Sequence, residues 1–219
     1  MTIEEQITQA KARGRFQQDV TIIAVTKAVS TERTKEALAA GLNHLGENRP
    51  EGLMTKQQAL PNAVWHYIGT LQTRKVRQVI NAIDYLHSLD RLSLAVEINK
   101  RATNSVKCFV QVNVSGEDSK HGLPASEVLT FIKSLADFDK IEVVGLMTMA
   151  PLQATEQQIR EVFMGLKTLQ QQVVALQLAH APCTELSMGM SNDYTIAIEE
   201  GATYVRIGTA LVGNESEEA

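Results

Sequence analysis

Short hydrophobic runs rich in Val, Ile and Thr alternate along the sequence with longer stretches whose apolar positions recur every three or four residues. Each run is bounded by Gly, Asn or Asp, which is typical of strands. The runs lie at residues 20–26, 44–48, 64–69, 85–90, 108–114, 141–149, 184–188 and 203–207. The pattern therefore predicts eight strands separated by helical segments.

The clearest helical pattern covers residues 155–177, where Thr155 and Gln158 have the spacing of a capping box. A second helix is expected to begin at Pro124, and weaker patterns begin near residues 31, 52, 71 and 92. The apolar face of the first helix comprises Ile159, Val162, Phe163, Leu166, Leu169 and Val173, and that of the second comprises Val128, Phe131, Ile132 and Leu135.

Eight strands alternating with helices over about 200 residues are typical of a single (β/α)8 TIM-type barrel. No Pro-, Gly- or Ser-rich linker divides the sequence, so we expect one barrel domain over residues 1–213 and a frayed acidic C-terminal tail over residues 214–219. The alternative is an open doubly wound sheet, but no Gly-rich nucleotide-binding motif follows the first strand.

Composition narrows the classes of partner. The formal net charge of −4 lacks the basic excess of a nucleic-acid binder, and no apolar run is long enough to cross a bilayer. Two cysteines fit a reducing compartment, and the polar start of the sequence has no signal-peptide core. We therefore expect a cytoplasmic protein with neither nucleic-acid nor membrane partners, and a monomer because no interface signature stands out.

Active sites of such barrels lie where the strands end, and the first strand delivers Lys27 there. A lysine at the edge of an apolar interior loses hydration, which lowers the pKa of its amine and favours imine formation. The alternative is an ordinary strand-end lysine that extends to water.

The last two strands run into small polar residues. Ser191 is expected to cap a helix or to donate its hydroxyl to a phosphate, and Gly208 and Thr209 offer backbone N–H groups and a second hydroxyl. Barrels often bind phosphate after these strands, although two ordinary capped turns would give the same pattern. Arg206 needs an acceptor, which either Glu185 or a ring nitrogen of a ligand would supply.

Three histidines, His44, His66 and His87, fall on the second to fourth strands and raise the possibility of a metal site. The first strand lacks a His-x-His pair, the fifth and sixth bring no histidine, and His44 lies early in its strand. We therefore expect no metal, and a metal-dependent hydrolase is the third hypothesis.

In the order of its motifs along the chain, from the Lys27 strand end to Arg206 and Thr209, the sequence resembles the pyridoxal phosphate homeostasis proteins. These are single-domain relatives of the alanine racemase barrel. The resemblance covers residues 3–213. It rests on Ile23-Ala-Val-Thr-Lys27, Gly46-Glu-Asn48, Trp65-His-Tyr-Ile-Gly69 with Leu71-Gln72, His87-Ser-Leu-Asp90, Val112-Asn-Val-Ser115, Gly145-Leu-Met-Thr-Met149, Leu186-Ser-Met-Gly-Met-Ser191 and Val205-Arg-Ile-Gly-Thr209.

The resemblance implies a binding site for pyridoxal 5'-phosphate. Lys27 would hold it as a Schiff base, and Arg206 would face its pyridine nitrogen. The phosphate would be bound by Ser191, Gly208 and Thr209, and the pocket would be lined by Asn48 and His66. The sequence departs from the family pattern at Arg49-Pro-Glu-Gly52 and at Thr70, which puts any shared function of those loops in doubt.

Such a site favours holding the cofactor over turning substrate over. A cation at the ring nitrogen weakens the electron sink of the ring, and racemisation needs a second acid/base group, which the racemases take from an added domain. The sequence stops shortly after the eighth strand, so we expect no such domain. The leading hypothesis is intracellular cofactor homeostasis without enzymatic turnover, with apo-enzymes as possible recipients; a weak amino-acid racemase is the alternative.

Overall fold

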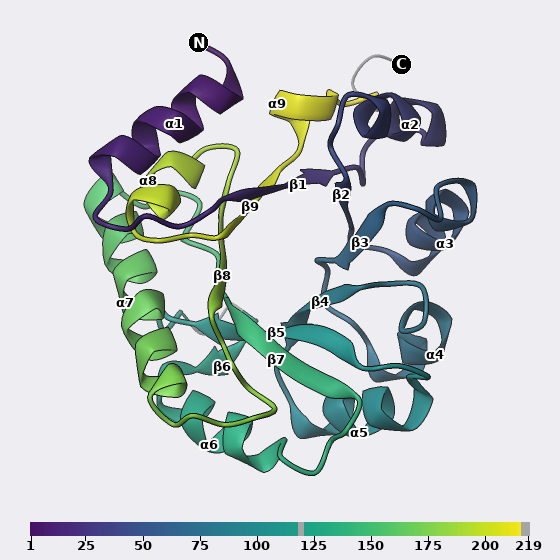
Figure 1. Ribbon diagram of the computed structural model, residues 1–219, viewed down its shortest axis with the longest axis vertical. Helices are drawn as coiled ribbons and strands as arrows, with labels where there is room; N and C mark the ends of the chain where they lie inside the picture. Colours follow the sequence, from purple (N-terminus) through teal and green to yellow (C-terminus); the bar gives the residue numbers. More distant parts are fainter. Residues whose placement is uncertain (118–120, 216–219) are drawn as a thin grey trace.

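Eight parallel strands close into a ring with helices around its outside, as the computed structural model shows for residues 1–117 and 121–215 (Figure 1). Neighbouring strands follow the order β4-β3-β2-β1-β9-β8-β7-β5, and pairing between β4 and β5 closes the ring. The predicted (β/α)8 barrel is confirmed. The strands of the ring are β1 (Thr21–Val25), β2 (His44–Glu47), β3 (Val64–Tyr67), β4 (Tyr85–Leu89), β5 (Val106–Asn113), β7 (Ile141–Met147), β8 (Glu185–Met190) and β9 (Tyr204–Ile207).

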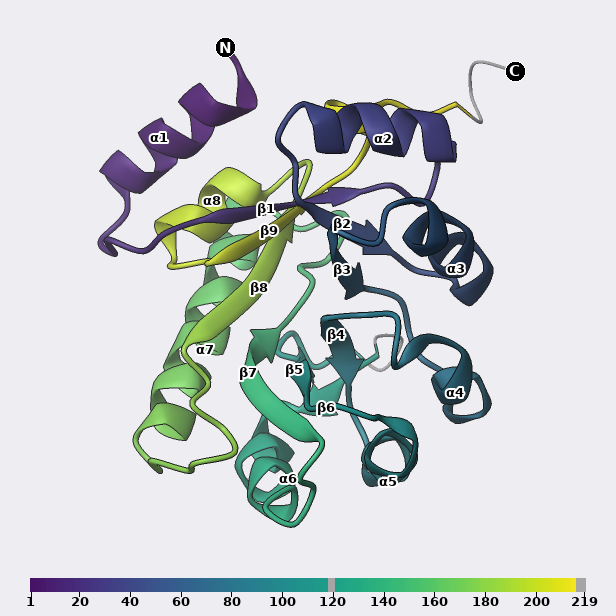
Figure 2. The same ribbon diagram turned by 45° about the vertical axis from the view of Figure 1, so that its right-hand side comes forward.

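The helices lie outside the ring and cover its apolar outer face (Figure 2). They are α1 (Ile3–Arg13), α2 (Thr31–Ala39), α3 (Pro50–Ala59), α4 (Val76–Val79), α5 (Leu92–Arg101), α6 (Val128–Ser134), α7 (Glu156–Val174), α8 (Tyr194–Glu199) and α9 (Thr209–Val212). Short 3-10 turns, η1 (Thr73–Lys75) and η2 (Ala125–Glu127), lead into α4 and α6, and the two-residue strand β6 (Leu123–Pro124) pairs with β5 outside the ring.

Local sequence signals explain where these helices begin. In α7, Thr155 accepts from the N–H of Gln158, and Gln158 accepts from the N–H of Thr155, so the predicted capping box is present. The same device starts α1 at Thr2 and Glu5. The strand pattern did not predict α1, which precedes the barrel and packs beside α8; there Tyr194 donates to Gln6 over 2.6 Å.

The C-terminal segment is held against the barrel as far as it is described. Glu215 accepts from the backbone N–H and the hydroxyl of Ser30, and its own N–H donates to the carbonyl of Ala28. The expectation that the chain frays from residue 214 is therefore wrong at residue 215, while residues 216–219 lie outside the described part.

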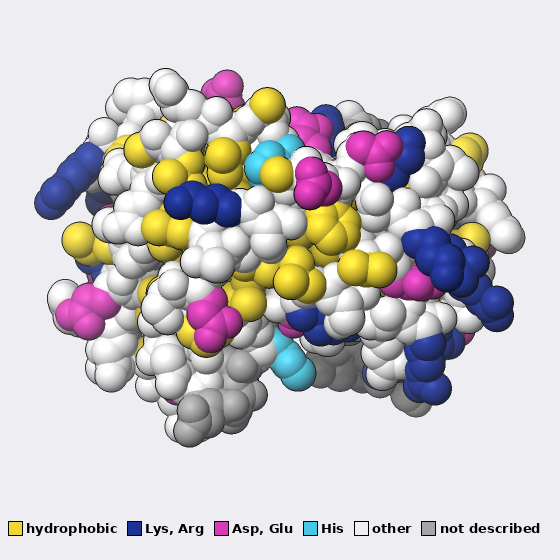
Figure 3. Space-filling model, turned by 90° about the horizontal axis from the view of Figure 1, so that it is seen from below, with side chains coloured by type: hydrophobic (Ala, Val, Ile, Leu, Met, Phe, Trp, Pro, Cys, Tyr) yellow, Lys and Arg dark blue, Asp and Glu magenta, His cyan; other side chains and the backbone are white. Residues whose placement is uncertain are grey.

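Two further features describe the surface and interior. Charged side chains of both signs border one face, while apolar side chains gather across its middle (Figure 3). No helix in the described ranges is long and apolar enough to cross a membrane. Inside the ring, Ile23, Phe109, Met147 and Tyr204 form an apolar cluster, and polar side chains share the rest of this interior.

Candidate functional site

The carboxyl ends of β8, β9, β1 and β2 bring most of the predicted cofactor residues to one side of the barrel mouth. These four strands are consecutive neighbours in the ring. Lys27 follows β1, Asn48 follows β2, Ser191 follows β8, and Gly208 and Thr209 follow β9. Parallel strands explain the convergence, because all their carboxyl ends meet at one edge.

Lys27 lies in the turn after β1, and its side chain is exposed. The loss of hydration that its position in the sequence suggested is therefore absent. Its backbone is nevertheless held firmly, because the preceding Thr26 is buried and its N–H donates to the carbonyl of Gly46 over 3.0 Å. The turn thus presents an accessible amine from a backbone segment that is held in place.

A buried cluster of Thr26, Glu47 and Lys56 holds the backbone before Lys27 in place. Lys56 of α3 reaches the Glu47 carboxylate over 2.6 Å and the Thr26 carbonyl over 2.6 Å, and the Thr26 hydroxyl donates to Glu47 over 2.7 Å. The ammonium and carboxylate groups are both buried and both hydrogen-bonded, as a buried ion pair requires. The cluster joins the ends of β1 and β2 and was not predicted from the sequence, although Glu47 lies in the Gly46-Glu-Asn48 motif.

The turn after β8 differs from the expectation. Asp193, not Ser191, occupies the N-cap position of α8, and its carboxylate accepts from the N–H of Met190 over 2.6 Å. Ser191 is half-buried in the preceding loop, so its hydroxyl is not used as a helix cap. Gly189 permits this turn, because its φ of +93° favours glycine and an added Cβ would come within 2.6 Å of Ala197.

The turn after β9 begins α9, with Gly208 at the N-cap and exposed Thr209 as the first helical residue. The first N–H groups of a helix have no partner within it, so this turn presents donors at the mouth. Asn48, on the other side of Lys27, is half-buried. Its backbone packs closely on Gly69, where an added Cβ would lie 2.4 Å from the Asn48 carbonyl oxygen.

Arg206 is buried inside the barrel near the end of β9. One guanidinium nitrogen donates to the Ser187 hydroxyl oxygen over 2.6 Å and another to the Thr148 carbonyl over 3.0 Å. Neither of these two acceptors is Glu185, the residue that the sequence suggested. Burial lowers the pKa of Arg206 to about 10, and the carboxylate of Asp193 opposes this shift.

His66 does not lie at the mouth. It is fully buried in the barrel interior, with one ring nitrogen 2.9 Å from His44 and the other 2.9 Å from His87. Both of its polar atoms are thus engaged by other rings, which leaves neither for a ligand at the Lys27 turn. Burial lowers the pKa of His66 and His87 well below the ordinary value of 6.5, and it also lowers the pKa of His44.

The three histidines hydrogen-bond to one another in a row and do not converge on one point. Among the described residues, no group of three or more His, Cys, Asp or Glu side chains is arranged to hold a metal ion.

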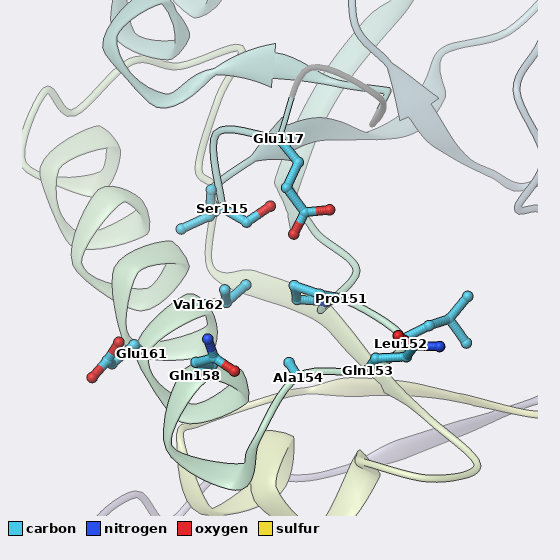
Figure 4. A pocket seen from close by; sticks show the side chains of 10 residues that line it. Ser115, Glu117, Pro151, Leu152, Gln153, Ala154, Gln158, Glu161 and Val162 are labelled. Carbon is cyan, nitrogen blue, oxygen red and sulfur yellow. The ribbon is translucent and has the colours of Figure 1, made fainter.

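A cavity of about 900 Å³ lies between two loops of the barrel and the start of α7 (Figure 4). It is lined by the loops after β5 and β7 and by the first turns of α7. Its polar side chains are those of Ser115, Glu117, Gln153, Gln158 and Glu161. The lining of this cavity includes none of the predicted cofactor residues.

The model of the family described as alanine racemase, N-terminal domain, matches residues 2–216. A pyridoxal phosphate homeostasis protein of Aquifex aeolicus is 38% identical over 215 residues, which cover 95% of this chain and 93% of that protein. The chain belongs to the pyridoxal phosphate homeostasis protein family. A family member from Escherichia coli K12 is 30% identical over 220 residues, covering 96% and 93% of the two chains.

Solved structures agree with this family assignment. PipY of Synechococcus elongatus PCC7942, solved with PLP bound, superimposes with a TM-score of 0.83 at 32% identity, covering 97% of this chain and 100% of PipY. Alanine racemase of Clostridium difficile 630 has a TM-score of 0.76 at 15% identity and shows the shared fold alone; the match covers 95% of this chain and 55% of that enzyme.

Replacing Lys56 by methionine tests the buried cluster. Lys56→Met leaves the Glu47 carboxylate buried without its cation, so we expect the free energy of unfolding to fall by about 3–5 kcal/mol in urea titrations. Lys35→Met is the matched control: Lys35 is exposed and lies 3.9 Å from Glu32, so its loss should cost less than about 1 kcal/mol. Equal losses for the two variants would contradict a structural role of the cluster.

The buried histidines predict a loss of stability in weak acid. Their folded-state pKa lies below the unfolded value of 6.5, so the unfolded chain binds more protons than the folded chain once the pH falls below 6.5. We expect the free energy of unfolding to decrease by up to about 1.4 kcal/mol per pH unit for each neutral ring, measured by urea titration between about pH 7 and 5.5. His66→Gln should reduce this slope, and a flat profile in the unmodified protein would refute the prediction.

Proposed function

We propose that this protein binds pyridoxal 5'-phosphate at the ends of β8, β9, β1 and β2 and serves intracellular cofactor homeostasis. The observation that carries the proposal is that three consecutive strands, β8, β9 and β1, bring an accessible lysine, a hydrogen-bonded arginine and two hydroxyl-bearing turns to the carboxyl-end side of the barrel. Family members named for pyridoxal phosphate homeostasis, and the PLP-bound structure of PipY, support it.

The residues at the mouth suit the chemical groups of this cofactor. The exposed Lys27 amine is free to bind an aldehyde carbon as a Schiff base. Ser191 and Thr209 supply hydroxyls, and Gly208 begins a helical turn whose backbone N–H groups suit a phosphate. Because the formal net charge is −4, affinity for a phosphate must rest on such local donors.

Arg206 is the residue that favours holding over turnover. When bound, the cofactor supplies an electron-withdrawing pyridine ring, which works best when its nitrogen is protonated. Arg206 is a donor, and with a pKa of about 10 it keeps its charge at neutral pH, so it would leave an adjacent ring nitrogen unprotonated. A weakened electron sink supports a carrier rather than a catalyst. In this proposal the carrier is a monomer that releases the cofactor to apo-enzymes, Asn48 lines its pocket, and Asp193 lies near enough to Arg206 to affect its pKa.

A weak amino-acid racemase is the second candidate. Lys27 is the one observation in its favour, since an exposed amine beside bound cofactor is also able to exchange a proton with a substrate. The racemase fold is shared, but the likeness to alanine racemase at 15% identity speaks for the fold alone.

Covalent capture of the cofactor tests the proposed function. Protein incubated with pyridoxal 5'-phosphate should turn yellow, and borohydride should fix the cofactor to the peptide that contains Lys27, as read by mass spectrometry. Lys27→Ala should lose this adduct completely, whereas Lys100→Ala, a change at an exposed lysine of α5, should retain it. An adduct that persists in Lys27→Ala, or unmodified protein that takes up no cofactor, would overturn the proposal.

Solvent exchange distinguishes the carrier from the racemase. With the cofactor bound and D- or L-alanine added in deuterium oxide, we expect no deuterium at Cα above the level given by free cofactor, because Arg206 weakens the electron sink. Proton NMR of the amino acid gives the readout. Sustained exchange that disappears in Lys27→Ala would establish the racemase-type activity in place of simple binding.

A further inference from the structure

Five polar side chains from five strands form a continuous hydrogen-bonded row through the barrel interior. We call His44, His66, His87, Ser187 and Arg206 the interior polar row. Successive polar atoms lie 2.9 Å apart from His44 to His66, 2.9 Å to His87, 2.9 Å to Ser187 and 2.6 Å to Arg206. The row runs from half-buried His44, the first residue of β2, to the guanidinium near the end of β9.

The guanidinium sets the direction of these hydrogen bonds, because arginine has donors and no acceptor. Arg206 donates to the Ser187 oxygen, so the Ser187 hydroxyl hydrogen must find an acceptor elsewhere. Within the described residues, its remaining hydrogen-bond partner is Nδ1 of His87. Ser187 therefore donates to His87, and the reverse arrangement would bury a hydroxyl hydrogen without an acceptor, which is costly.

The same logic passes along the three rings. With its Nδ1 accepting, neutral His87 carries its proton on Nε2 and donates to Nδ1 of His66. His66 in turn carries its proton on Nε2 and donates to Nδ1 of His44. Each ring is therefore assigned the same tautomer by a charge at the far end of the row.

We propose that the interior polar row is a one-directional hydrogen-bond chain of three neutral, Nε2-protonated histidines that holds the Ser187 hydroxyl, and through it Arg206, in a fixed orientation. Ser187 and His87 are thus positioning residues for Arg206. Two of the five guanidinium donors are fixed by Ser187 and Thr148, which orients the remaining ones. The consequence for cofactor binding rests on the proposed function, in which Arg206 faces the ring nitrogen.

The surroundings of the row keep it neutral. His66 stacks on Tyr85 with ring centroids 4.5 Å apart, and His87 stacks on Phe109 at 4.4 Å. The charged and titratable groups that face the row are Asp84 beside His44, the tyrosines Tyr85 and Tyr204, and Asp193 opposite Arg206. Burial lowers the pKa of His87, and the nearby charge of Arg206 lowers it further, because a proton added to the ring would place a second cation beside the guanidinium.

Nitrogen-15 NMR of the imidazoles tests the row in cofactor-free protein. Long-range proton–nitrogen correlation spectra at neutral pH should give His44, His66 and His87 the same pattern, with a protonated Nε2 and an unprotonated Nδ1. Spectra of His44→Gln, His66→Gln and His87→Gln assign the signals. An Nδ1-protonated ring, a mixture of tautomers or a charged ring in the row would overturn the proposal, whether or not the protein binds pyridoxal 5'-phosphate.

Ser187→Ala tests the positioning role. Removing the hydroxyl takes away the donor to His87 and the acceptor of Arg206, so we expect loss of the uniform tautomer pattern and about tenfold weaker binding of pyridoxal 5'-phosphate. Ser187→Thr, which keeps a hydroxyl, should restore both. Ser88→Ala is the matched control: Ser88 is buried next to His87 in sequence, but its hydroxyl has no hydrogen-bond partner among the described residues, so both readouts should stay unchanged.

The two readouts separate the possible failures. Unmodified protein that shows the expected tautomers but binds no cofactor refutes the proposed function and leaves the row intact. Unchanged tautomers and unchanged affinity in Ser187→Ala would refute the positioning role, while cofactor binding by the unmodified protein would still stand. Thermal unfolding of the serine variants without cofactor verifies that each comparison is made on folded protein.

Discussion

A buried guanidinium must be hydrogen-bonded on the protein's own groups, and much of the barrel interior follows from that requirement. Arg206 has no acceptor of its own and keeps its charge, so each group that contacts it has to accept. Ser187 and the Thr148 carbonyl do so, and Ser187 then needs an acceptor in turn. Each residue of the row thus requires a hydrogen-bond acceptor on another strand. The row ends at His44, which is only half-buried and lies near water.

A second buried charge is handled differently on the other side of the mouth. Lys56 and Glu47 form an ion pair beside the Thr26 turn. The ammonium donates to the Glu47 carboxylate and the Thr26 carbonyl, and the Thr26 hydroxyl donates to Glu47, so these three residues satisfy one another's hydrogen bonds. Two ionic arrangements thus border the candidate site, and both tie the ends of neighbouring strands together. Exposed Lys27 sits between them, directly after Thr26, on backbone that has little freedom to move.

The sequence was sufficient for elements whose signals are local. The eight strands and the Thr155 capping box depend on residue types within a few positions, and the structure confirms them within a few residues. Ser191 is not the cap of α8, because the helix begins two residues later than expected, with Asp193 at the N-cap position and its carboxylate bonded to the Met190 N–H before the helix. The exposure of Lys27 depends on how far the turn projects beyond the barrel, which residue types alone do not encode.

The interior polar row was beyond sequence reasoning for a different reason. Three histidines on successive strands raised the possibility of a metal site, which the sequence pattern did not favour. Whether such rings converge or form a row depends on the stagger between strands. Parallel pairing sets His66 opposite Gly46 and Tyr85, so consecutive histidines are displaced along the barrel and meet edge to edge. Knowing that Arg206 and Ser187 share a face with them requires the register of β8 against β9 as well.

The proposed carrier role is consistent with an exposed lysine after β1 and a buried, hydrogen-bonded arginine on the neighbouring strand β9. A catalytic lysine gains from desolvation, which strengthens it as a nucleophile and base. Because Lys27 is exposed, water would have ready access to hydrolyse the Schiff base that the proposed function places there. A fixed orientation of Arg206 affects affinity instead. Donors that are oriented in advance lower the entropy lost on binding. In the proposed carrier, the ordered barrel interior around Arg206 would provide affinity, and the solvent-exposed turn at Lys27 would allow release. The two properties would then be set by different parts of the same barrel.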